Sequence, residues 1–256
     1  MKTQLALCLA SVVAVSLVHA SPADDVAAAA SKLAVAPNYS WKVTTEFANS
    51  QFPAVPSEGV TEKDGYTVIT TSFNGTTRQT VRKGEKLVMQ NRDGEWITME
   101  EMRQQFANAA GGGGGGAGGQ RGAGRAGFGL FMMGRGAQMD FAKDAANLAG
   151  KIKDAKKEDG AIVGTLGESD AAALLSFGRG GRGGGAAAPT AKNASATVKF
   201  WLKDGQLAKY ATSVKGTVTT PAGDEREVDL TTTTEISQVG STKVVVPEDA
   251  KKKLEL

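Results

Sequence analysis

Alternation of apolar and polar positions is the first pattern in the chain, and it predicts β-strands. Between Asn38 and Phe47, the residues Tyr39, Trp41 and Val43 alternate with polar residues, as in a half-buried strand. Further β-rich runs follow Asp-Gly and Asn-Gly pairs, which tolerate the positive φ angles of tight hairpins. These runs are YTVITTSF, TTRQTVRK and EWIT, and a single glycine precedes EKLVMQ. The pattern predicts an antiparallel meander.

The middle of the chain has helical periodicity instead. Phe141, Ala145 and Leu148 recur at three- and four-residue steps within 139–157, which predicts one amphipathic helix, weakened at Gly150. A short strand, GAIVGTL, follows it. We predict further helices at 100–110, at 168–177 and after Pro247.

The C-terminal part returns to β-type patterns. ATVKFWLKDGQLAKYATSVKGTV predicts a hairpin about Asp204 and Gly205, and REVDLTTTTEISQVG predicts a long β-branched strand. The order is therefore many strands, a helical insert and then long strands. This order predicts an α+β fold in which helices cover one face of a curved antiparallel sheet.

The first twenty residues have the pattern of a secretory signal. Lys2 supplies the positive start, an apolar core follows, and Val-His-Ala predicts cleavage near Ala20. Residues 21–37 are predicted to form an Ala-rich linker with a short helix, and 38–256 a single domain. We expect an extracytoplasmic protein, periplasmic or secreted, with no transmembrane segment after the signal is removed.

The distribution of cysteine and histidine narrows the function further. Cys8 and His19 are the only residues of their types, and both are predicted to leave with the signal. Cysteine nucleophiles, Ser-His-Asp triads and Cys/His metal sites are then excluded from the mature chain. We predict a binding or structural protein that is not an enzyme and has no catalytic residue, metal or cofactor.

Two glycine-rich tracts, at 111–136 and 178–190, interrupt the domain and are predicted to be flexible loops. Their five arginines account for the formal net charge of +3, and the remainder of the mature chain is close to neutral. Three interpretations stay open: solvated loops, contact with anionic lipid headgroups or envelope polymers, and RNA binding of the RGG kind. The export signal argues against nucleic acid. The candidate anion contacts are Arg121, Arg125, Arg135, Arg179 and Arg182.

An apolar cluster, FGLFMM, ends the first tract. Five large apolar side chains in six positions, at 128–133, are costly to leave in water. They could pack onto the domain as the lead-in to the helix at Phe141. Alternatively, they could form a mobile lid over an apolar cavity or a tip that touches a membrane, and methionine suits either role because it adapts its shape.

Several stretches together resemble a known superfamily. YSW, KGEKLVMQNRDGEWIT, FWLKDGQLAKYATSVKGTV and TTTTEISQVGSTKVVVPEDA, in that order, are similar to the LolA-like and LppX/LprG-like envelope proteins. The resemblance spans roughly Asn38 to Leu254. It implies a strongly curved antiparallel sheet, a half-barrel covered by helices, around an apolar cavity for acyl chains. The lipid-anchoring cysteine of the LppX/LprG type is absent, and the glycine tracts are not part of the superfamily pattern.

The resemblance leads to a functional expectation. The chain is expected to be an exported soluble protein that binds a lipid or lipid anchor in a half-barrel cavity without catalysis, with 128–177 as a lid hinged at the glycine tracts. The alternative is a structural or interaction protein of the envelope, with a self-filled sheet and Arg-Gly loops on anionic polymers. The candidate cavity or lid residues are Trp41, Val43, Phe128, Leu130, Phe131, Met132, Met133, Phe141, Leu148 and Phe200.

Overall fold

A computed structural model describes the backbone of most of the chain. The described residues are 21–48, 56–73, 75–91, 93–111, 140–176, 190–219 and 223–255. The predicted signal, the FGLFMM cluster and nearly all of both glycine tracts lie outside these residues, and so do the five arginines.

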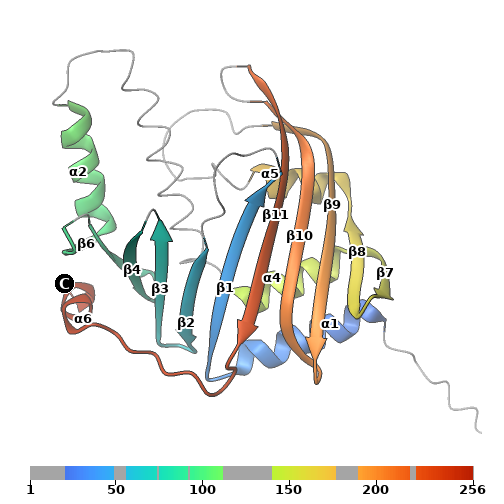
Figure 1. The fold of residues 1–256 in the computed structure, drawn as a ribbon, viewed down its shortest axis with the longest axis horizontal. Coiled ribbons are helices and arrows are strands. Elements are labelled where there is room, and N and C mark those ends of the chain that lie inside the picture. The colour runs from blue at the N-terminus through green and yellow to red at the C-terminus, as the bar shows by residue number, and fades with distance from the viewer. Residues whose placement is uncertain are drawn as a thin grey trace, which may run out of the picture.

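The described strands form one antiparallel sheet, in the order β6-β5-β4-β3-β2-β1-β11-β10-β9-β8-β7, which is not closed into a barrel (Figure 1). The predicted meander and hairpins are confirmed, and β1 pairs with β11 from the far end of the chain. The strands are β1 (Asn38–Phe47), β2 (Ser57–Glu62), β3 (Tyr66–Phe73), β4 (Thr76–Lys83), β5 (Lys86–Gln90), β6 (Trp96–Thr98), β7 (Lys153–Glu158), β8 (Ala161–Leu166), β9 (Thr190–Lys203), β10 (Gln206–Thr219) and β11 (Glu225–Ser237).

One antiparallel sheet with helices packed on it confirms the α+β class, but the helices lie on both faces of the sheet and not on one face as predicted. Successive residues of a strand point to opposite faces. Ile69 packs into the main core with α1 and α4, whereas its neighbour Val68 packs with α6. We call the side of Ile69 the inner face and the side of Val68 the outer face. The described helices are α1 (Pro22–Val35), α2 (Met99–Gly111), α4 (Phe141–Lys151), α5 (Glu168–Ser176) and α6 (Glu248–Glu255).

Helix α1 occupies the segment that was predicted to be a linker. Ser21 caps it, because its hydroxyl accepts from the Asp24 backbone while Asp24 accepts from the Ser21 backbone in return. Val26 and Leu33 lie on its buried stripe, which packs against α4 and β10. The predicted short helix is therefore present but longer, and it is packed into the domain because its small alanines allow two helices to approach closely.

The segment 139–157, predicted to be one helix, contains a helix followed by a strand. Helix α4 ends at Lys151, and β7 begins two residues later with Asp154 at a φ of 53° and a shift in register. The apolar residues Ile152 and Ala155 continue the helical spacing in the sequence, but they lie beyond the end of α4. Strand β8 then pairs with β9, so the described part of the insert is built into the domain and cannot swing as one lid.

Candidate ligand-binding face

Cross-strand partners share a face, so the register identifies what lines the inner face of the sheet. Two neighbouring rows cross its centre. One row is Thr71, Ser57, Val43, Thr234, Tyr210 and Phe200. The next row is Thr45, Thr232, Thr212 and Val198. The first row runs from a hydroxyl-rich end on β2 and β3 to an aromatic end on β9 and β10.

The aromatic part is filled by the protein's own side chains. The ring centroids of Trp41 and Phe141 lie 4.8 Å apart, and Phe200 is fully buried in the same cluster. The Trp41 indole lies over Gly59, and its Nε1 donates to Thr61 Oγ1 at 3.0 Å. Only glycine leaves room for the ring at this position. Helix α4 is thereby seated on the sheet through Phe141.

Two buried tyrosines add hydrogen-bonding groups beneath α4. The Tyr210 hydroxyl donates to Asp144 Oδ2 at 2.8 Å. Burial, together with the Asp144 carboxylate, raises the pKa of Tyr210 well above its ordinary value. Burial, with a smaller contribution from Asp140, raises the pKa of Tyr39 to about 12. Both phenols are therefore neutral at physiological pH, and the Tyr210 hydroxyl serves as a hydrogen-bond donor.

The hydroxyl-rich part forms a second zone of the inner face. Thr45 and Thr232 share a hydrogen bond at 3.3 Å, and Ser57 and Thr71 share one at 3.4 Å. When two threonine hydroxyls bond to each other within the sheet, their methyl groups remain available for apolar contact. The Thr234 hydroxyl, between the two zones, is buried beside its cross-strand partner Tyr210.

A methionine cluster ends the inner face at β5 and β6. Met89 and Ile97 are buried there beneath Met102 of α2. Leu87 and Met99 pack around them. Methionine adapts its shape to irregular partners, so this surface suits an apolar molecule of variable form.

The outer face carries a different kind of surface. A groove of about 700 Å³ crosses β10, β11, β1, β2 and β3 and is open to solvent. Its charges alternate, with Lys42 and Glu58 paired at 2.9 Å. At the β10 end of the groove, Lys209 Nζ lies 4.7 Å from the centre of the Trp201 ring. Alternating charges of this kind are typical of a solvated sheet face, and we assign the groove no ligand.

The structure brings several predicted site residues together. Trp41, Phe141, Leu148 and Phe200 belong to one buried cluster, and Val43 is half-buried against it. Phe128, Leu130, Phe131, Met132 and Met133 lie outside the described residues, as do Arg121, Arg125, Arg135, Arg179 and Arg182. Whether any of them contacts a ligand stays a prediction.

Sequence reasoning missed the hydroxyl rows and the methionine cluster. The alternation that placed Trp41 and Val43 on one face also places Thr45 there, so one signal was present along β1. Met89 and Met102 come from different elements, and only the tertiary structure shows that they meet.

Two further observations concern the part of the chain that the structure describes. None of its helices has both the length and the apolar character needed to cross a membrane. Within it, no three side chains of His, Cys, Asp or Glu gather as metal ligands.

Comparisons with known proteins give structural neighbours only. No family model matches the chain, and no curated protein matches it. The chain is similar to LprF from Mycobacterium bovis, with 11% identity, a TM-score of 0.41, and coverage of 90% of this chain and 97% of that one. It is also similar to the LolA superfamily protein NE2245 from Nitrosomonas europaea, with 7% identity, a TM-score of 0.31, and coverage of 89% and 96%.

One open antiparallel sheet with helices is the class of fold that the resemblance in the sequence implies. TM-scores below 0.5 carry no weight on ligand or mechanism. Those have to be inferred from the chain's own residues.

Proposed function

We propose that this protein binds a hydrophobic ligand, a lipid or lipid anchor, on the inner face of its sheet and that it performs no catalysis. The observation that carries the proposal is the composition of that face. That face carries the Trp41 and Phe141 core with the paired hydroxyls beside it. Along the cross-strand row of Trp41, it reaches the methionine cluster at Met89. Apolar burial at about 25 cal/mol per Å² would drive binding without any reactive group.

The hydroxyl zone is the proposed seat of the ligand. Its hydroxyls pair with one another, so an acyl chain lying over Thr45 and Thr232 would meet methyl groups without leaving those hydroxyls unpaired. The neutral phenol of Tyr210 lies in the same cross-strand row as Ser57 and Thr71, and it would not repel an anionic head. We place the activity outside the cytoplasm, after cleavage near Ala20.

The alternative is a structural or interaction protein of the envelope, and one observation favours it. The α1 and α4 end of the inner face is already filled by Phe141, Phe200 and Trp41. If the whole face is filled in the same way, no ligand can enter. The Arg-Gly loops would then be the working surface, through contact with anionic polymers.

Neighbouring threonines on β11 provide a matched test of these two functions. Thr232 points to the inner face and Thr233 to the outer face, and both are half-buried. Titration with N-phenyl-1-naphthylamine, an apolar fluorophore, would measure uptake by the wild type and by Thr232→Phe and Thr233→Phe. We expect Thr232→Phe to weaken uptake at least severalfold and Thr233→Phe to leave it unchanged, with the thermal transition retained in both. Equal uptake by both folded variants would contradict a site on the inner face.

A further inference from the structure

Helices from opposite faces of the sheet meet at its β6 edge. Helix α2 begins directly after β6 and lies on the inner face, where Met102 covers Met89 and Ile97. Helix α6 packs on the outer face of β4, β5 and β6, after the chain has run along one end of the sheet from β11 (Figure 1). Two segments far apart in the sequence therefore enclose the same edge.

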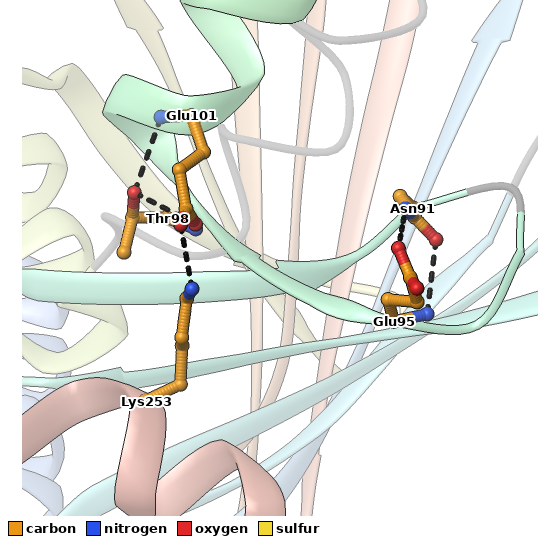
Figure 2. Close-up of polar contacts among 5 residues, drawn as sticks. All are labelled: Asn91, Glu95, Thr98, Glu101 and Lys253. Carbon is orange, nitrogen blue, oxygen red and sulfur yellow. Dashed lines mark hydrogen bonds and ion pairs between the residues drawn. The ribbon is translucent and has the colours of Figure 1, made fainter.

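One ion pair joins these two helices around the edge. Lys253 Nζ donates to Glu101 Oε1 at 2.6 Å, between residues 152 positions apart in the chain (Figure 2). The other oxygen of Glu101 accepts from the Thr98 backbone N–H at 2.8 Å and from the Thr98 hydroxyl at 3.2 Å. In return, the Glu101 backbone N–H donates to Thr98 Oγ1 at 3.2 Å.

The Glu101 carboxylate therefore has two tasks. With Thr98 it forms a capping box at the start of α2, and with Lys253 it ties α2 to α6. The Lys253 ammonium lowers the pKa of Glu101 below its ordinary value, and the Thr98 backbone N–H makes a smaller contribution in the same direction. The carboxylate is accordingly ionised at neutral pH, as the tie requires.

We propose that Lys253 and Glu101 form a clasp that holds the first turns of α2 over the methionine cluster, and that its opening admits the hydrophobic ligand at this end of the inner face. Glu101 directly precedes Met102, which packs on Met89 and Ile97. Lifting Met102 would uncover Met89 and Ile97, which are now buried. The proposal that the ligand enters when the clasp opens rests on the proposed function, whereas the existence of the clasp does not.

Helix α6 has an anchor of its own, so the clasp can open without its release. Val246, Ala250 and Leu254 are buried against outer-face valines of β3, β4 and β5. Lys253 is not among these apolar contacts, and a quarter of its side chain is exposed. Helix α2 is the weaker partner, because it contacts only β5 and β6 extensively among the described elements.

The test uses three single variants of the full mature chain. Lys253→Met removes the ammonium but keeps an apolar stem. Glu101→Gln removes the charge but leaves a side chain that can still accept from Thr98. Lys252→Met is the matched control, because Lys252 is on the same helix and, among the described residues, forms its ion pair with nearby Asp249 at 3.6 Å.

Amide hydrogen exchange over 99–105 and stopped-flow uptake of N-phenyl-1-naphthylamine are the two measurements. We expect Lys253→Met and Glu101→Gln to speed exchange about two- to fivefold, the range typical of an exposed ion pair. Probe uptake should accelerate by a similar factor, and Lys252→Met should match the wild type in both.

The outcomes separate the clasp from the function. Exchange in Lys253→Met that equals exchange in Lys252→Met would overturn the clasp. Faster exchange with unchanged uptake by a protein that does bind the probe would overturn its role as an entry. Failure of the wild type to take up probe would count against the proposed function and the entry, while exchange in α2 would still decide whether the clasp exists.

Discussion

At the scale of the residue, Gly59 shows how a single missing side chain positions the core. A Cβ at this position would collide with the Trp41 indole, which is packed on Phe141. We expect Gly59→Ala to destabilise the fold by about 1–3 kcal/mol, because the ring has to move in a packed core. Urea denaturation followed by circular dichroism would measure the change.

Gly150 is the matched control for this substitution. It is exposed in α4, and nothing lies within 4 Å of a Cβ added to it. Gly150→Ala should therefore raise the stability by roughly 0.8–1 kcal/mol, from helix propensity alone. If both alanine variants shifted the urea midpoint in the same direction, the steric account of Gly59 would be wrong.

The buried phenols predict a loss of stability at alkaline pH. Tyr39, with a pKa of about 12, and Tyr210, with a pKa well above its ordinary value of 10, both hold their protons more tightly when folded. A raised folded-state pKa contributes stability that is complete below pH 10 and is lost as the pH rises above it.

Tyrosinate absorbance in a Tyr66→Phe variant measures this effect, because the chain has three tyrosines and only the two buried ones remain. We expect no ionisation near pH 10 while the protein stays folded, and ionisation at higher pH to coincide with unfolding. A titration midpoint near pH 10 in the folded protein would show that the phenols are accessible.

At the scale of the element, local patterns predicted the strands well and the helix boundaries less well. Period-2 alternation with Asp-Gly and Asn-Gly pairs suffices for β3, β4 and the β9–β10 hairpin, because neighbours in sequence pair in space. Helix α1 was underestimated because its alanines resemble a linker, and its burial depends on α4, over 100 residues away. Likewise, nothing local indicates that Lys253 meets Glu101.

The FGLFMM cluster gives a prediction at the same scale. If 128–133 are the apolar edge of a lid, deleting them should weaken retention of N-phenyl-1-naphthylamine while the cooperative thermal transition persists. A dissociation rate measured by dilution, together with a thermal melt, would separate the two roles. Loss of the cooperative transition would indicate that the cluster is part of the core.

At the scale of the whole molecule, the inner face serves both as the packed core and as the proposed ligand-binding surface. Its α1 and α4 end is a packed core, which stabilises the sheet through Phe141 and Phe200. Its β2, β3 and β5 end carries the paired hydroxyls and methionines that we propose for the ligand. The pairing of β1 with β11 makes these two ends parts of one surface, and this pairing is a long-range feature that joins the two ends of the chain.

The most direct test of hydrophobic-ligand binding is native mass spectrometry of residues 21–256 purified from a bacterial periplasm, followed by extraction with organic solvent. We predict a bound mass that leaves with the solvent and is identified as lipid. A ligand-free mass, combined with no uptake of added phospholipid, would contradict the carrier function and favour an envelope interaction protein.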